Sequence, residues 1–426
     1  MAHLPLGSAL AAIASALPLL GCSTRPGGKP LAWTAATSPA STRTATASAP
    51  TANAGAPLRA AARRGDSAAI RARLAAGDDI NAADPAGERP LHVAAAGDHA
   101  DAVKLLLQSG AAIDARTADG KTPLHLAAMG DGRAAAALIA GGADIGARDD
   151  WGQTPLHLAA YGGSEAVVQL LLSKNADRAA QDNDGETPLF KAASSGEVEV
   201  LQILLSAGAD PNTPRRPPPG SPVPTGDAPI VAAAREEQLA VLQALIKAKA
   251  NVKAAGEAGQ TALHITAGKN QVEISQALIA AGADINAADA QGITPIHRAA
   301  GRGKADAVKL LIAKQADLSL RTKMGQTPLL TAASANEADL CAALLDAGAD
   351  PRAIDNDGNT ALHLAAQSGD FKTVRTLIEN GLDRMARNNA GKTPADITEN
   401  ERVKTMLAPT GTTPCEMRLT SLHPAI

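Results

Sequence analysis

The chain has 426 residues, enough for two or three ordinary domains or for one extended array of repeats. Hydrophobic residues make up 45% of the chain but aromatic residues only 1%, so alanine, leucine and isoleucine must fill the interior. The 40 basic and 43 acidic residues give a formal net charge of -3, which provides no electrostatic reason to expect nucleic acid or an anionic membrane surface as a partner.

The first predicted element is an N-terminal signal. Residues 4–20 form an apolar run broken only by Pro, Gly and Ser, and the run ends in Leu-Leu-Gly-Cys at residues 19–22. A short apolar run with small residues at its exit is typical of a secretory signal, here residues 1–21, rather than of a mature element.

The Leu-Leu-Gly-Cys string resembles the lipobox of bacterial lipoproteins. That resemblance implies cleavage after Gly21, lipidation of Cys22 and firm anchoring by several acyl chains. Because Ser23 rather than Asp follows the cysteine, it also implies sorting to the outer membrane, with the protein in the periplasm or at the cell surface. Residues 1–3 contain no Lys or Arg, and two alternatives stay open: a plain secretory signal, or a disordered tail in which Gly-Cys occurs by chance.

Residues 22–50 are mostly Ser, Thr, Ala and Pro and contain few large apolar side chains. Such a segment cannot bury enough surface to order itself, and we expect a disordered tether between anchor and folded body.

One motif, Thr-Pro-Leu-His-x-Ala-Ala, recurs along residues 51–408. Successive proline positions are 33, 33, 32, 33 and 41 residues apart and then 33 apart five times, which makes eleven units. The positions are Pro57, Pro90, Pro123, Pro155, Pro188, Pro229, Ala262, Pro295, Pro328, Ala361 and Pro394. A fixed period of this length predicts a stack of units, none of which buries its apolar faces alone.

Each part of the motif has a physical role in a helix–turn–helix unit. Thr caps a helix whose first residue, Pro, has no N–H to leave unpaired. The Ala pair lets neighbouring helices approach closely, and a second helix ends at a residue that tolerates left-handed geometry, such as Gly142 or Asn175. This motif resembles the ankyrin repeat. The resemblance implies an all-α solenoid of about eleven helix–turn–helix units with projecting β-hairpin-like turns and a concave protein-binding face.

Six histidines occupy the fourth motif position, and a row of histidines suggests a metal site. They are His92, His125, His157, His264, His297 and His363. Stacked helices lie about 8–10 Å apart, whereas two imidazoles that share zinc need nitrogens within about 4 Å. We therefore expect no metal and no cofactor, and the resemblance implies that each ring hydrogen-bonds its local turn.

The chain carries no nucleophile elbow, phosphate loop or zinc-spaced cysteine cluster, so we expect no catalytic residue and no enzyme activity. Cys341 falls where the second helix of its unit needs a small buried residue. Cys415 lies in residues 409–426, which we expect to be a disordered tail.

Partner-binding candidates are the aromatic and apolar residues on the expected binding side. Trp151 follows Asp149 and Asp150 at a turn tip, Tyr161 ends an inner helix, and Met129 takes the same place one unit earlier. Trp and Tyr are common energetic anchors of interfaces, so we predict Trp151, Tyr161, Met129 and Asp150 as partner-binding residues. The alternative for Trp151 is that it only covers the neighbouring turn.

A proline-rich insertion at residues 213–227 accounts for the one long spacing, between the fifth and sixth units. It predicts a stiff loop that contacts a partner or divides the binding face, or else a tolerated surface insertion.

These observations predict a secreted, lipid-anchored scaffold or inhibitor that binds another protein and is itself a monomer. An immunity-type inhibitor of a toxin in the periplasm is one alternative. A spacer with no specific partner and an enzyme whose site lies on the insertion or tail are the others.

Overall fold

The computed structural model describes residues 55–217 and 226–408. The predicted signal at 1–21 with Cys22, the tether at 22–50, the tail at 409–426 with Cys415, and residues 218–225 of the insertion lie outside the described residues. By its contacts the chain divides into residues Met1–Ala49 and a repeat body, Pro50–Ile426, and only the repeat body is considered below.

The described residues form eleven repeats, each with a first and a second α-helix. The first helices are α1 (Ala56–Arg63), α3 (Pro90–Ala96), α5 (Pro123–Ala127), α7 (Pro155–Tyr161), α9 (Pro188–Ser195), α11 (Pro229–Arg235), α13 (Ala262–Gly268), α15 (Pro295–Ala300), α17 (Pro328–Ser334), α19 (Ala361–Ser368) and α21 (Pro394–Ile397). The all-α fold and the eleven units predicted from the period are confirmed.

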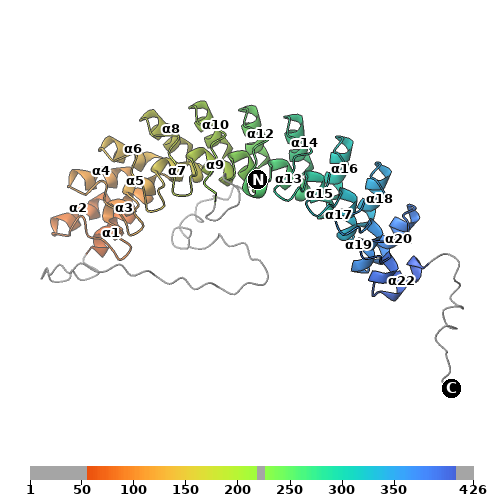
Figure 1. Cartoon of the computed structure of the whole chain (residues 1–426). Coiled ribbons are helices and arrows are strands. Elements are labelled where there is room, and N and C mark those ends of the chain that lie inside the picture. The colour runs from red at the N-terminus through yellow and green to blue at the C-terminus, as the bar shows by residue number, and fades with distance from the viewer. Residues whose placement is uncertain (1–54, 218–225, 409–426) are drawn as a thin grey trace, which may run out of the picture. The chain divides into compact units, whose positions relative to one another are not determined.

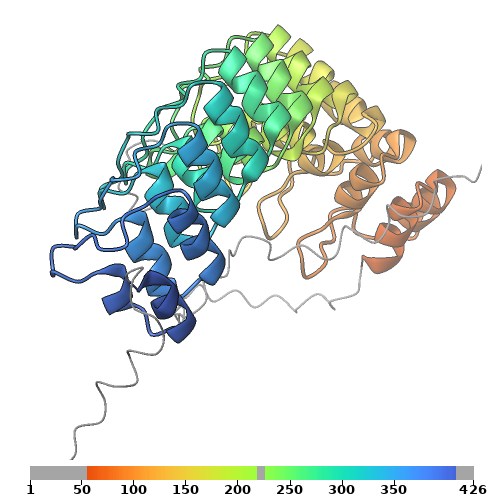
Figure 2. The ribbon, with the colours of Figure 1, turned by 90° about the vertical axis from the view of Figure 1, so that its right-hand side faces the viewer.

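The second helices form the other layer of the repeat body (Figure 1). They are α2 (Ser67–Ala75), α4 (Ala100–Gln108), α6 (Arg133–Ala140), α8 (Glu165–Ser173), α10 (Val198–Ser206), α12 (Leu239–Lys247), α14 (Val272–Ala280), α16 (Ala305–Ala313), α18 (Ala338–Asp346), α20 (Phe371–Glu379) and α22 (Glu401–Leu407). A short 3₁₀ turn, η1 (Glu257–Gly259), lies before α13. Each second helix is joined to the next first helix by a finger loop, and the finger loops project from the stack (Figure 2).

The fourth repeat shows why its first helix begins where it does. The His157 backbone N–H donates to the Thr154 hydroxyl, and the Thr154 backbone N–H donates to His157 Nδ1 at 3.1 Å. Pro155 opens the helix with no N–H to leave unpaired. This reciprocal cap satisfies two donors that a helix start otherwise leaves open, so the predicted role of the Thr-Pro pair is confirmed.

The predicted ends of the second helices are confirmed as well. Gly142 follows α6 with φ of 92°, and Asn175 follows α8 with φ of 62°, both in the left-handed region. Most side chains are strained in that region, which is why Gly and Asn occupy these positions.

Small aliphatic residues fill the core between the layers. In the fourth repeat Leu156, Ala159, Ala160, Val168 and Leu171 are fully or almost fully buried. The buried apolar residues form two clusters, one from Leu58 to Ala283 and one from Ala267 to Leu407, which meet at the seventh repeat. The low aromatic content is therefore compatible with a closely packed interior, because Ala lets the helices approach.

Neighbouring finger loops are tied together by backbone hydrogen bonds. The Asn183 N–H donates to the Trp151 carbonyl at 2.9 Å, and the Arg216 N–H donates to the Asp184 carbonyl at 2.7 Å. Within each finger loop the chain reverses tightly, as where Gly152 N–H donates to the Asp149 carbonyl. The described residues contain no β-strand apart from an isolated bridge between Ala255 and Thr261.

Candidate partner-binding surface

The inner face of the repeat body consists of the exposed residues of the first helices and the adjoining finger loops. Two positions of each repeat contribute to it, one directly after the histidine position and one three residues further on, at or just after the end of the first helix. In the third repeat these are Leu126 and Met129, and in the fourth they are Leu158 and Tyr161. Met129 is 55% exposed and Tyr161 is 52% exposed, whereas the two leucines are half-buried.

Met129 lies beside the end of α7. A β-carbon placed on Gly162, the residue after Tyr161, would be 3.3 Å from Met129 Cγ. The side chain of Met129 therefore covers the glycine that follows Tyr161. Met129 and Tyr161, two of the predicted binding residues, belong to one apolar patch across the third and fourth repeats. The patch is formed by Leu126, Met129, Leu158 and Tyr161.

Trp151 stands at the tip of the finger loop between these two repeats. Its backbone N–H donates to Asp149 Oδ1 at 3.0 Å, and its carbonyl accepts from Asn183, so the backbone of the tip is fixed on both sides. The ring remains 51% exposed, with Lys121 Nζ 4.9 Å from its centroid. The Lys121 contact uses only part of the ring, which leaves a large apolar surface for a partner.

Asp150, the fourth predicted binding residue, already has an intramolecular partner. Its Oδ1 atom lies 3.3 Å from Arg116 Nη2. A β-carbon placed on Gly120 would be 2.2 Å from the same oxygen, so the carboxylate lies directly over that glycine. The structure thus groups Met129 with Tyr161 and gives Asp150 a contact between finger loops.

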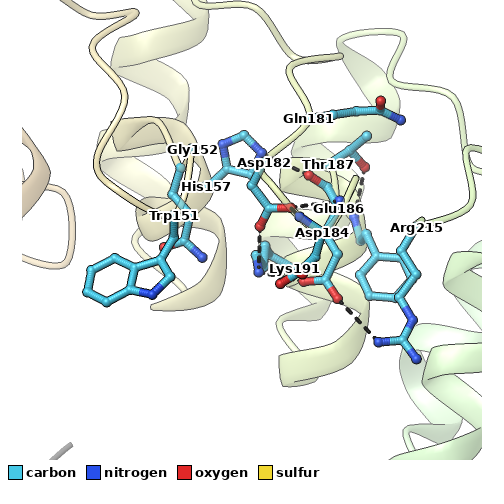
Figure 3. Close-up of polar contacts among 12 residues, drawn as sticks. Trp151, Gly152, His157, Gln181, Asp182, Asp184, Glu186, Thr187, Lys191 and Arg215 are labelled. Carbon is cyan, nitrogen blue, oxygen red and sulfur yellow. Dashed lines mark hydrogen bonds and ion pairs between the residues drawn. The ribbon is translucent and has the colours of Figure 1, made fainter. Parts of the chain in front are cut away.

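A cluster of ion pairs follows the apolar patch along the inner face (Figure 3). Lys191 Nζ lies 2.9 Å from Asp182 Oδ2 and 2.5 Å from Glu186 Oε2, and its side chain is only 12% exposed. Burial alone would lower the pKa of Lys191, but its bonds with Glu186 and Asp182 outweigh burial and raise the pKa. Figure 3 shows the Trp151 ring pointing away from this cluster.

The ion pairs continue to the base of the insertion. Arg215 Nη2 lies 3.7 Å from Asp227 Oδ2, and Arg235 Nε lies 2.7 Å from the same oxygen. The Arg215 N–H also donates to the Asp227 carbonyl at 3.0 Å. The two ends of the insertion are therefore held next to each other.

None of the four ion-pair residues Lys191, Arg215, Asp227 and Arg235 is among the predicted binding residues. Each stands at a position that varies between units, so none has a local signature. The signal that could have found them is their alignment in the repeat, which places Lys191 at the inner-face position of Leu126 and Leu158 and Arg235 at that of Met129 and Tyr161.

The six motif histidines connect repeats to one another. Each Nδ1 accepts from the threonine or arginine N–H at the helix start, and each Nε2 lies about 3 Å from a carbonyl of the next finger loop, as in the 3.0 Å contact of His157 with Glu186. Since Nδ1 accepts, the Nε2–H form is the one that satisfies both contacts. Burial lowers the pKa of all six, for His157 to about 4. In the described residues no three His, Cys, Asp or Glu side chains are grouped for a metal ion.

Comparison with known proteins agrees with this architecture. Residues 58–149, 130–215, 230–322 and 296–388 match the family described as Ankyrin repeats (3 copies). The chain belongs to the ankyrin repeat family. A search of curated protein sequences gives no match.

Two features follow from the family. Ankyrin repeats typically mediate binding to another protein, and the family is generally non-enzymatic. The matches to ankyrin repeats break between residues 215 and 230, where the insertion predicted at 213–227 lies.

Cys341 is a core residue of its ankyrin repeat, as predicted. It is fully buried in α18, and burial, with a smaller contribution from Glu337, raises the pKa of its thiol to about 12. A thiol with this pKa stays protonated at neutral pH and is a poor nucleophile.

Proposed function

We propose that this chain is a protein-binding scaffold of the bacterial envelope, anchored by lipid at Cys22, whose partner docks on the third and fourth repeats. The observation that carries this proposal is that Met129 and Tyr161 on the inner face, and Trp151 at the tip of the finger loop between their repeats, are all about half exposed. The chain has only five aromatic residues, two Trp, one Tyr and two Phe, and two of these five lie here.

The surface has the composition of an interface centre. Trp, Tyr and Met are enriched at such centres, and the rings of Trp and Tyr bury a large apolar area with only two rotatable bonds each. Leu126 and Leu158 extend the patch, and the fixed backbone of the Trp151 tip reduces the entropy lost on binding. A partner with a complementary apolar ridge would gain most of its affinity from these side chains.

The anchoring part of the proposal rests on the Leu-Leu-Gly-Cys string at residues 19–22. No helix among the described residues has the length and apolar character needed to span a bilayer. Acylation at Cys22 would place the repeat body at a membrane surface through a tether.

Affinity capture from cell envelopes tests the partner site, with the full-length chain as bait. We expect the variant Trp151→Ala/Tyr161→Ala to retain the partner at least about tenfold less well, the scale of a modest hot spot. Its melting temperature should be unchanged, because both side chains are half-exposed. Met385→Ala is the matched control, since Met385 is equally exposed on the finger loop between the tenth and eleventh repeats. Equal retention by the double variant and the control would contradict the proposed site.

Two further measurements separate scaffold from inhibitor and test the anchor. An inhibitor of a toxin would form a one-to-one complex of very high affinity, which calorimetry with the captured partner measures. Metabolic labelling with radioactive palmitate should mark the chain and should not mark Cys22→Ser. Labelling of that variant would contradict lipidation at Cys22.

A further inference from the structure

Beyond the ion-pair cluster the inner face becomes rich in positively charged side chains. In the sixth to eighth repeats it carries Arg235 at the end of α11, Lys269 after α13, and Arg298 and Arg302 in and after α15. Arg298 stands at the position of Leu126 and Leu158, so a cation replaces an apolar side chain at the same place in the repeat.

Two glycines open space between these helices. Gly268 and Gly301 occupy the position that Tyr161 and Met129 hold in the fourth and third repeats. A β-carbon on Gly268 would be 2.7 Å from Arg298 Cγ and 3.3 Å from Arg302 Nη1, so both arginines lie against this glycine. A side chain there would push Arg298 away.

Two neighbouring cavities lie beside these arginines. One, of about 290 Å³, is lined by Arg235, Lys269, Arg298 and Arg302 together with His264 and Ile265. The other, of about 320 Å³, includes Arg298, Arg302, Gly301, Ile293, Lys323 and Met324. Arg298 and Arg302 belong to both, so they form the wall between the cavities.

The carboxylates nearby do not satisfy all of the cations. Arg235 is paired with Asp227 at 2.7 Å, Arg298 with Asp289 at 2.8 Å and Lys269 with Glu237 at 3.2 Å. Over the described residues Arg302 makes no ion pair, and Arg298 Nε is buried without a hydrogen-bond partner.

Burial lowers the pKa of Arg298, and the positive charges of Arg302 and Arg235 lower it further, against the opposing effect of Asp289. An added carboxylate would relieve this repulsion and supply the missing acceptor.

We propose that these two cavities, which share Arg298 and Arg302 and of which the smaller also has Arg235 and Lys269, dock a segment of a partner protein rich in Asp or Glu. The proposal rests on the proposed function, because it assigns a second contact region to the same protein-binding face. Guanidinium groups bind carboxylates in a two-pronged geometry, and Ile265, Ile293 and Met324 give aliphatic walls to a peptide.

An acidic protein segment fits this site better than nucleic acid does. No Phe, Tyr or Trp lines either cavity, and the two lining histidines, His264 and His297, are buried, whereas binding of single strands relies on exposed aromatic rings for stacking. The net charge of -3 also gives no long-range attraction for a polyanion as large as a nucleic acid.

The test is fluorescence anisotropy of a fluorescein-labelled hexaglutamate peptide titrated with the full-length chain. We expect saturable binding that weakens as salt rises, because the site is open to solvent. Arg298→Gln/Arg302→Gln should weaken binding at least about tenfold. The control Lys309→Gln/Lys314→Gln removes the same charge from exposed positions in and after α16 of the same repeat, and should change binding less than about twofold.

Gly268→Ala provides a variant that keeps every charge. Alanine is favoured in a helix, so α13 should fold, but its β-carbon displaces Arg298 and Arg302. We expect weaker binding of hexaglutamate with an unchanged circular dichroism spectrum. Gly268→Ala therefore tests the role of Arg298 and Arg302 even if the double arginine variant does not fold.

Three results would overturn the proposal: no saturable binding of hexaglutamate, equal losses in the arginine and lysine variants, or tighter binding of an oligothymidylate of the same charge. Failure here together with a positive Trp151→Ala/Tyr161→Ala result in envelope capture would leave the scaffold function standing without the acidic docking site.

Discussion

The fourth and seventh repeats have the same backbone plan and differ at the centre of the helix interface. In the fourth, Ala159 and Val168 are both fully buried. In the seventh, the same two positions are Thr266 and Ser275, also fully buried, and the Ser275 hydroxyl donates to Thr266 Oγ1 at 2.9 Å. A repeat of this family therefore accepts a polar pair in its core, provided that the pair is internally hydrogen-bonded.

The polar pair also marks where the apolar core divides. Leu278 of the seventh repeat belongs to the first hydrophobic cluster and Ala267 to the second. The hydroxyl pair contributes less apolar contact than Ala and Val would, so the array is held together less by apolar burial at this repeat than at the fourth.

The same two repeats differ on the inner face. Tyr161 ends α7 with an exposed ring, whereas Gly268 ends α13 with no side chain and leaves room for Arg298 of the next repeat. One position of the motif thus decides whether the surface presents an apolar anchor or a cationic cavity.

Acid should weaken both repeats, because each holds its motif histidine neutral. Burial lowers the pKa of His157 to about 4, against about 6.5 in the unfolded chain, so only the unfolded state takes up the proton in between. The contribution of neutral His157 to the free energy of unfolding is fully present above about pH 6.5. It is lost as the pH drops toward 4, and the loss is roughly 3 kcal/mol.

Urea unfolding at several pH values measures the acid effect. His157→Phe copies the fifth repeat, where Phe190 occupies this position, and should lose less stability than the parent chain between pH 6.5 and 4. If the free energy of unfolding depended on pH identically in the two proteins, the pKa of His157 would be the same in the folded and unfolded states.

Val168→Ser places half of the polar pair in the fourth repeat and tests whether one hydroxyl is tolerated there without the other. It removes buried methyl groups and leaves a hydroxyl without a side-chain partner, so we expect a loss of about 2–3 kcal/mol in urea unfolding. Adding Ala159→Thr supplies the partner and should restore about 1 kcal/mol. If the changes in unfolding free energy of the two single variants simply added in the double variant, the Thr–Ser hydrogen bond would contribute nothing.

The reverse exchange, Thr266→Ala/Ser275→Val, should have the smallest effect. Replacing both members of a hydrogen-bonded pair by the apolar residues of the fourth repeat should leave stability within about 1 kcal/mol of the parent or raise it. Thr266→Ala alone should cost about 1–2 kcal/mol, since the Ser275 hydroxyl then loses its partner. Calorimetric melting compares the double variant with Thr266→Ala alone. A double variant less stable than Thr266→Ala would contradict the expectation that an apolar pair replaces the polar pair at little cost.

The sequence by itself determined the fold of this protein. The Thr-Pro-Leu-His motif fixes the helix starts through contacts within four residues, as in the cap of Thr154 and His157, and the 33-residue period fixes the stacking. Cys341 and the Ala pairs follow from the same period. Local hydrogen bonding and repetition are readable in one dimension, so these elements needed no coordinates.

Only the tertiary structure decided what the inner face presents. Arg298 lies across Gly268, a residue 30 positions earlier in the chain, and Met129 covers Gly162, a residue 33 positions later. Such contacts join variable positions of neighbouring repeats, where a residue's surroundings depend on how closely two helices pack. Packing distance is set by the stacked body as a whole, and for that reason no single repeat of the sequence could reveal the cationic cavities.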